Sequence, residues 1–176
     1  MDALAKRLGR FTGFRRDSAT LRGEGRAGRH KVLLVKPQEY MNRSGAALRA
    51  LLAEGWIAPE ILVVYDEVYL PLGTLRLRSR GGAGGHQGLE SILEAIGSEE
   101  FPRLRIGVGP APPSEDLAEY VLAPFSEGER EGVPRVIEAA AECAFDAVAE
   151  GLTMAMNRWN RFGRDTTIER GDDETV

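Results

Sequence analysis

Residues 61–92 read ILVVYDEVYLPLGTLRLRSRGGAGGHQGLESI, and this stretch decides the fold. It opens with a short apolar run, Ile61–Tyr65, the pattern of a strand buried on both faces of an α/β sheet. The run stops at Asp66 and Glu67, where we expect the strand to emerge from the sheet. Because ligands of open α/β sheets collect at the carboxyl ends of the strands, Asp66 is a candidate site residue. On the residues alone, a turn-forming or helix-capping acid remains the alternative.

The second half of this stretch offers positive charge. Thr74–Arg80 alternates arginine and leucine, so its three arginines, with Arg78 at their centre, share one face of a predicted strand. Guanidinium groups on one face repel each other unless something negative lies across them. A glycine-rich loop, residues 81–88, then opens a helix predicted over Leu89–Ile96, and backbone N–H groups at such a helix start also favour an anion. We therefore expect an anionic substrate, and a polyanion fits best.

Strand and helix patterns alternate through the rest of the chain. Lys31–Lys36 and Arg103–Val108 are further predicted strands, and Val133–Glu150 is the longest predicted helix. This alternation predicts one α/β domain over residues 1–162, a three-layer sandwich in which helices flank a mixed, mostly parallel sheet. Residues 163–176 are rich in acids and are predicted to be a disordered tail.

The composition narrows the class of protein. A chain of 176 residues with 43% apolar residues fits one globular core, and no run approaches the roughly 20 apolar residues of a membrane helix. The single cysteine, Cys143, cannot form an internal disulfide, which suits a reducing cytoplasm. The net charge of −4 hides an asymmetry, because residues 1–49 carry +8 and residues 50–176 carry −12. One face can thus attract phosphate while the rest stays acidic.

The remaining polar candidates are ambiguous. Asn42 precedes a predicted helix and is either a turn residue or an amide that holds a substrate. His86 is tempting as a general base, but we prefer a role in which a ring nitrogen bonds its neighbours. The glycine loop lacks both the dinucleotide spacing and the Gly-Lys-Ser/Thr of a P-loop, and no residues have metal-ligand spacing. The residues alone therefore predict no metal site.

Four segments resemble, in order, motifs of the bacterial peptidyl-tRNA hydrolase family. The resemblance runs from Met1 to about Phe162 with single-residue gaps, and four motifs in register are far more specific than one. The segments are residues 36–45, KPQEYMNRSG, which resemble P-x-x-[FY]-M-N-x-S-G; residues 64–73, VYDEVYLPLG, which resemble HDELDLPPG; residues 81–89, GGAGGHQGL, which resemble GGGHGGHNGL; and residues 101–109, FPRLRIGVG, which resemble F-x-R-L-R-I-G-I-G.

The resemblance implies a function. Members of this family cleave the ester between peptide and tRNA in peptidyl-tRNA released from stalled ribosomes, in the cytoplasm, usually as monomers and without a cofactor. It implies that Asp66 orients a catalytic histidine, that Asn42 holds the peptide backbone near the ester carbonyl, and that Tyr40 lines the same cleft. It further implies that Arg78 and Arg105 clamp a tRNA phosphate, which agrees with the arginine face inferred from alternation.

The sequence departs from the family pattern in two places. Gln87, beside His86, stands where the family usually has asparagine, so its amide lies one methylene further out. The family also begins with a strand and a T-R-H-N-x-G segment that carries the catalytic histidine, whereas Met1 aligns with the helix after it. We therefore expect residues 1–176 to be weak or inactive by themselves.

That second departure leaves several hypotheses open. A start assigned too late, for instance by reading an internal valine codon as the initiator, is one explanation; a non-catalytic RNA-binding paralogue of the same fold is the other. A nucleotide-binding α/β enzyme that uses the glycine loop is a third and weaker hypothesis, since the phosphate motifs are missing. Without the first strand of the family, a central sheet edge should be open and apolar surface bare.

Overall fold

The protein is described from a computed structural model, which places residues 1–112 and 116–163. The predicted tail, residues 163–176, lies outside these ranges except for Gly163. The elements in chain order are α1 (Asp2–Arg7), β1 (Arg15–Asp17), β2 (Thr20–Ala27), β3 (His30–Pro37), the 3-10 turn η1 (Met41–Arg43), α2 (Ser44–Ala53), the 3-10 turn η2 (Ala58–Glu60), β4 (Val63–Pro71), β5 (Leu75–Arg78), α3 (Gln87–Ile96), β6 (Arg103–Gly109), α4 (Leu117–Leu122), α5 (Glu127–Ala149) and α6 (Leu152–Trp159).

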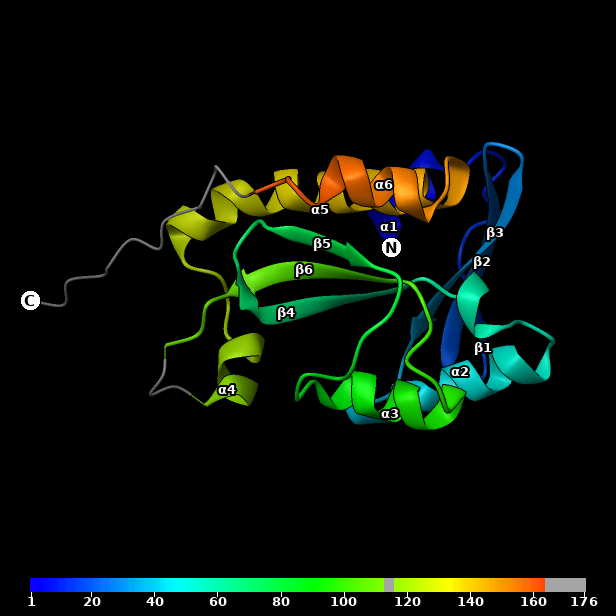
Figure 1. The fold of residues 1–176 in the computed structure, drawn as a ribbon, viewed down its shortest axis with the longest axis horizontal. Helices are drawn as coiled ribbons and strands as arrows, with labels where there is room; N and C mark the ends of the chain where they lie inside the picture. The colour runs from blue at the N-terminus through cyan, green and yellow to red at the C-terminus, as the bar shows by residue number, and fades with distance from the viewer. Residues whose placement is uncertain (113–115, 164–176) are drawn as a thin grey trace, which may run out of the picture.

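Two three-stranded sheets form the middle layer of an α/β sandwich (Figure 1). One has the order β1-β2-β3, and the other has the order β4-β6-β5. Helices α5 and α6 lie over one face, and α2 and α3 lie over the other (Figure 1). The predicted α/β sandwich is confirmed.

The prediction of a mostly parallel sheet is wrong for the described residues. Only β4 and β6 pair in parallel, whereas β1 with β2, β2 with β3 and β5 with β6 are antiparallel. The reason is local: β1, β2 and β3 follow one another through two-residue turns, and such turns can join only antiparallel strands.

The hydrophobic core has two parts, one on each face of the sheets. Leucines of β5 and β6 pack on α5 on one face, and all of them are fully buried: Leu75, Leu77 and Leu104. On the other face, Leu48 of α2 packs with Leu89 of α3 and with Phe101. The burial of alternate residues in β5 confirms the leucine and arginine faces predicted for that strand.

Strand β4 runs further than predicted. It continues through Asp66 and Glu67 to Pro71, because β6 keeps pairing beside it. Gly107 of β6 permits this close approach, since a Cβ at that position would collide with the Pro71 carbonyl. As neighbours within a strand, Asp66 and Glu67 point to opposite sides of the sheet.

Strands β3 and β4 each have one edge without a partner strand among the described residues. β3 is the last strand of its sheet and β4 the first of the other. Both strands line one apolar groove of about 560 Å³, together with side chains from the helices above and below.

Candidate active site

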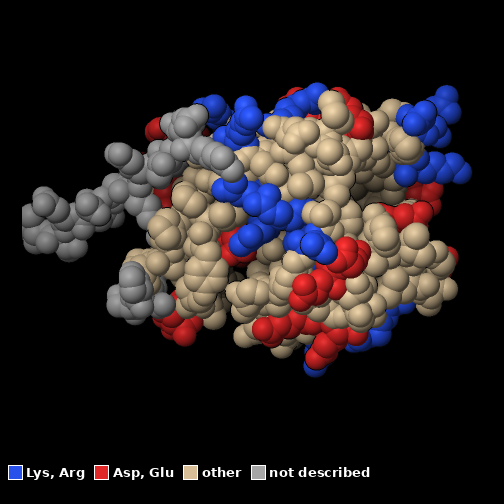
Figure 2. All heavy atoms as spheres, viewed as in Figure 1, with Lys and Arg blue, Asp and Glu red and all other residues tan. Residues whose placement is uncertain are grey.

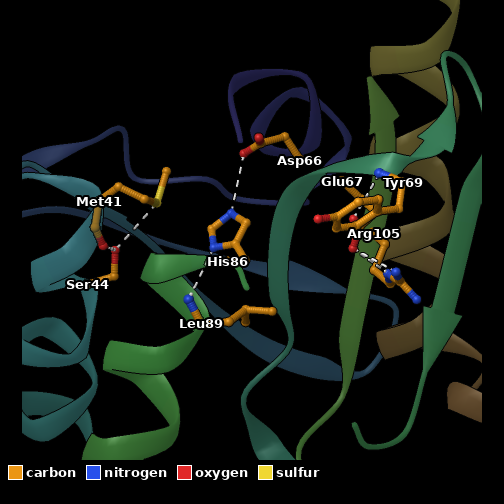
Figure 3. A network of polar contacts seen from close by, with 8 residues as sticks. All are labelled: Met41, Ser44, Asp66, Glu67, Tyr69, His86, Leu89 and Arg105. Atoms are coloured by element: carbon orange, nitrogen blue, oxygen red, sulfur yellow. Dashed lines mark hydrogen bonds and ion pairs between the residues drawn. The ribbon is translucent and has the colours of Figure 1, made fainter. Parts of the chain in front are cut away.

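The two central groups of the candidate site are Asp66 and His86. Asp66 extends from β4, and His86 is the residue that caps the start of α3 (Figure 3). The His86 Nε2 atom lies 3.7 Å from Asp66 Oδ1, and both residues line the end of the groove. The structure thus brings together two candidates that are far apart in the sequence.

The other ring nitrogen of His86 is already engaged. Its Nδ1 accepts a hydrogen bond of 3.2 Å from the Leu89 backbone N–H, as an N-cap side chain does (Figure 3). A neutral imidazole has one donor and one acceptor nitrogen, so its proton is on Nε2 and faces Asp66. The neutral ring has no lone pair left to take a proton from water. The predicted bond between His86 and a neighbour is present.

Each group of the pair favours the charged form of the other, although a charged imidazolium could not keep the Leu89 N–H bond on Nδ1. The bond from His86 lowers the pKa of Asp66 below its usual value, although burial opposes the shift. Reciprocally, Asp66 raises the pKa of His86. The ring of Tyr65 lies edge-on to His86 with centroids 5.1 Å apart, and burial raises the pKa of the Tyr65 hydroxyl. Tyr65 lines the groove and also the hollow on the other side of β4, a role that the sequence analysis missed.

Three predicted substrate-binding residues lie at the exposed start of two elements, η1 and α3, and are not among the residues that line the groove. Tyr40, 80% exposed, precedes η1; Asn42 lies within η1; and Gln87 is the exposed first residue of α3. Turn η1 packs on α3 so closely that a Cβ on Gly88 would lie 2.7 Å from Met41 Sδ. Turn η1 and the start of α3 thus form one rim, but none of these three side chains is among those that line the groove at Asp66 and His86.

The arginine face borders a second hollow, of about 360 Å³. Glu67 orients Arg105 there: Arg105 donates from Nε and Nη2 to Glu67 Oε2 at 2.9 and 2.7 Å. The register of β5 against β6 puts Arg78 opposite Arg103, so arginines of two strands meet at the hollow. Figure 2 shows Lys and Arg gathered over these strands, with acidic side chains gathered below them. The hollow is lined by Tyr65, Glu67, Arg78, Arg80, Arg103, Arg105 and the loop residues 81–84.

Arg103 has a structural task that the sequence did not reveal. It is only 2% exposed, and it donates to the carbonyls of Gly82 and Glu99 at 3.0 and 3.2 Å while stacking over the Phe101 ring. These bonds hold the glycine loop against β6. The strand pattern predicted for Arg103–Val108 could not show that Arg103 is buried whereas Arg105 is partly exposed.

Neither a cluster of metal ligands nor a membrane-spanning helix occurs among the described residues. No three His, Cys, Asp or Glu side chains gather there in a way that would hold a metal ion. Within the same ranges, no helix is long and apolar enough to cross a membrane. Fold and site together define an α/β protein with a carboxylate–imidazole pair on one side of a strand and a basic hollow on the other.

Comparison with known proteins identifies the family. The family model for peptidyl-tRNA hydrolase matches residues 1–168, so the chain belongs to the peptidyl-tRNA hydrolase family. The chain is 44% identical to the peptidyl-tRNA hydrolase of Carboxydothermus hydrogenoformans, over 93% of this chain and 87% of that protein. It is 47% identical to the enzyme of Aquifex aeolicus, over 77% and 71% of the two chains.

Solved structures agree with this assignment. The crystal structure of peptidyl-tRNA hydrolase from Acinetobacter baumannii superposes with a TM-score of 0.80 at 32% identity, covering 92% of this chain and 82% of that one. A complex of peptidyl-tRNA hydrolase with N-propanol gives a TM-score of 0.82 at 33% identity and the same coverage. The family inferred from four motifs is therefore confirmed.

Proposed function

We propose that this protein acts on peptidyl-tRNA and hydrolyses the ester that joins the peptide to the tRNA. The observation that carries the proposal is the placement of the Asp66–His86 pair and the basic hollow on either side of β4 in a member of this family. A substrate with an ester next to a polyanionic backbone requires both kinds of site. Peptidyl-tRNA arises at ribosomes, so the protein works in the cytoplasm, and we take a monomer to be sufficient.

The basic hollow receives a phosphate of the tRNA backbone. Arg78 and Arg105 reach it from neighbouring strands, and the bond to Glu67 fixes the direction of the Arg105 guanidinium. A guanidinium that is already oriented loses less rotamer entropy when a phosphate binds. Backbone contacts of this kind position an RNA without reading its sequence.

The rim at η1 and α3 receives the peptide end. Asn42 and Gln87 carry amides that can bond a peptide backbone, and Tyr40 offers an exposed aromatic face. Through its longer side chain, Gln87 places its amide further from α3 than an asparagine would.

The hydrolytic step needs a group that takes a proton from water. Since His86 Nδ1 is bonded to Leu89 and its Nε2 faces Asp66, the acceptor left in the described pair is the Asp66 carboxylate. A carboxylate with a lowered pKa is a weak base, so Asp66 serves chiefly to orient the imidazole that faces it. We therefore propose that residues 1–176 alone bind acylated tRNA well and cleave it slowly.

His86 Nδ1 already accepts a hydrogen bond from Leu89 and is not free to take a proton from water. This observation favours a second candidate function, RNA binding without hydrolysis. One experiment separates the two: cleavage of N-acetyl-aminoacyl-tRNA under single-turnover conditions, together with binding of the same tRNA. Hydrolysis above the buffer rate that falls at least tenfold in Asp66→Asn supports the esterase. Tight binding with cleavage at the buffer rate in both proteins supports the RNA-binding function, and weak binding with no cleavage refutes both.

A further inference from the structure

Tyr69 of β4 presents an exposed aromatic ring two residues beyond Glu67, the acid that orients Arg105 in the basic hollow. The residue is 64% exposed, and within the described residues its ring pairs with no other aromatic ring and with no cation. The motif HDELDLPPG has an aspartate at this position, so the ring is a feature of this chain and not of the motif. Because single exposed apolar residues are ordinary, the surroundings of Tyr69 must decide whether it binds anything.

An irregularity in β4 turns Tyr69 outward. From Glu67 to Pro71, β4 advances four residues while its partner β6 advances two. The extra residues arch away from the ladder, as in a β-bulge, and a bulge changes the direction of the side chains that it carries. Gly109 of β6 permits the arch, because a Cβ there would collide with the Val68 carbonyl. Tyr69 lies in the middle of this arch, which accounts for its exposure.

One buried carboxylate ties the arch to the basic hollow. Glu67 is 8% exposed, and its Oε1 accepts a hydrogen bond of 3.1 Å from the Tyr69 backbone N–H. Its Oε2 accepts both hydrogen bonds from Arg105. Figure 3 shows Tyr69 and Arg105 next to each other around this carboxylate. The two oxygens of one side chain thus hold an aromatic residue and a cation in a fixed relation.

This combination suits an unpaired nucleotide. Arg78 and Arg105 offer positive charge to its phosphate, and Tyr69 offers an aromatic face to its base. Proteins that bind single-stranded RNA combine these two contacts, because every base has a face that can stack on an aromatic ring. A base inside a duplex is already stacked on its neighbours. Only a base outside the paired stem can therefore use Tyr69.

We propose that Tyr69 is a stacking site for an unpaired nucleobase next to the phosphate in the basic hollow. This inference rests on the proposed function, since it needs a tRNA phosphate in that hollow. In peptidyl-tRNA the unpaired bases beside the acceptor stem belong to the 3′ end, which carries the peptide. Asp66 lies three residues before Tyr69, at most about 10 Å along the strand. A base held by Tyr69 therefore guides the ester-bearing end toward Asp66.

Two RNA hairpins test this site without any measurement of cleavage. The first copies the acceptor stem of a tRNA, with a 5′ phosphate and an unpaired 3′ end that carries no amino acid. The matched hairpin has abasic nucleotides in the unpaired end, so it keeps every phosphate and loses only the bases. Fluorescence anisotropy at several salt concentrations measures the binding of the full chain to each hairpin.

The abasic hairpin should bind at least fivefold more weakly than the intact one, because base stacking is lost. The slope of log K against log salt should be the same for both, because the phosphate contacts are unchanged. Tyr69→Ala should abolish the difference between the hairpins, whereas Tyr69→Phe should keep it, since phenylalanine retains the ring.

The outcomes separate this inference from the proposed function. Equal binding of both hairpins by the wild type, or a difference that persists in Tyr69→Ala, would overturn the stacking site and leave the phosphate in the hollow. No binding of either hairpin would overturn the proposed function as well.

A tryptophan gives a direct readout of stacking. In Tyr69→Trp, the intact hairpin should quench the fluorescence of the new tryptophan and the abasic hairpin should not, after subtraction of the wild-type signal from Trp56 and Trp159. Quenching by both hairpins or by neither would contradict the proposal. The control variant is Ile57→Ala, a 57% exposed position before η2 and the opposite end of β4, which should bind both hairpins as the wild type does. Thermal unfolding first confirms that every variant is folded.

Discussion

The two sides of β4 differ in how fully their charged groups are paired. On one side, Glu67 is almost buried and accepts two hydrogen bonds from Arg105, at 2.9 and 2.7 Å. On the other, Asp66 is partly exposed and faces His86 at 3.7 Å, at the end of an open groove (Figure 3). Consecutive residues of one strand thus build one site that is preorganised and one that still has room for a partner. We infer that the basic hollow is ready for an anion, whereas the Asp66–His86 pair is held less firmly.

The largest expected effect comes from removing the arginine that supports the hollow. Arg103→Ala should lower the free energy of unfolding by about 2–4 kcal/mol, because two carbonyls lose their donors and a cavity opens over Phe101. Urea denaturation measures it. The matched control, Arg80→Ala, removes an exposed ion pair with Glu100 and should cost less than about 1 kcal/mol. Equal losses in the two variants would show that Arg103 does not hold the loop.

Next in size is the effect of the hollow on RNA binding. Arg105→Gln should weaken tRNA binding about tenfold at low salt and reduce the slope of log K against log salt by about one, because one phosphate contact is lost. The control is Arg49→Gln on the exposed surface of α2, which should change neither quantity. Fluorescence anisotropy at several salt concentrations measures both, and an unchanged slope in Arg105→Gln would place the phosphate elsewhere.

The Asp66–His86 pair should give a smaller effect on the free energy of unfolding, and this effect should depend on pH. Because the pKa of His86 is raised in the folded protein, its protonation stabilises the fold. This stabilisation is complete below pH 6.5 and is lost as the pH rises through the pKa that His86 has in the folded protein. Because the pKa of Asp66 is lowered in the folded protein, its ionised form stabilises the fold. This stabilisation is present above pH 3.8 and is lost as the pH falls through the pKa that Asp66 has in the folded protein. The destabilisation caused by Asp66→Asn should therefore be largest between these limits, near pH 5–6, and should shrink at alkaline pH.

NMR titration of the His86 ring measures the same coupling directly. Its pKa should lie above 6.5 in the wild type and fall in Asp66→Asn, since the carboxylate is the largest cause of the shift. His30 provides an internal comparison in the same spectra, because it lies exposed at the start of β3. If Asp66→Asn leaves the His86 titration unchanged, the two groups do not interact in solution.

The smallest expected effect is at the rim. Gln87→Asn shortens an exposed side chain at the first position of α3, so thermal unfolding should change by less than about 0.5 kcal/mol. If Gln87 contacts the peptide, as we propose, the KM for N-acetyl-aminoacyl-tRNA should change instead. A KM that stays constant in this variant would remove Gln87 from the peptide-binding rim.

The sequence predicted those parts of the fold that depend on local pattern. The strands at β3, β5 and β6 and the helix at α3 follow from apolar periodicity and agree with the structure to within one or two residues. The end of β4 was wrong because two adjacent carboxylates are typical of a strand end. Glu67 stays in the strand since Arg105, 38 residues away in sequence, neutralises it there.

The start of α5 was also wrong, although the sequence contained a signal for it. The helix begins at Glu127, behind a capping box formed by Ser126 and Glu129, and not at Val133. Pro134 is typical of a first helical turn but lies within this helix.

For the site, the motifs named the residues but not their contacts. Asp66 and His86 were candidates from the residues alone, and the family resemblance gave Asp66 its role, yet only coordinates show which ring nitrogen faces the carboxylate and which one accepts from Leu89. The direction of the His86 ring and the burial of Arg103 depend on tertiary packing, which the hydrophobic periodicity of a sequence does not report.

The most direct test of the central claim is the single-turnover cleavage of N-acetyl-aminoacyl-tRNA by residues 1–176 and by Asp66→Asn. Our account predicts slow cleavage above the buffer rate in the wild type, a loss of at least tenfold in Asp66→Asn, and equal tRNA binding by both. Equal cleavage rates in the two proteins would contradict it, since Asp66 would then have no part in the chemistry.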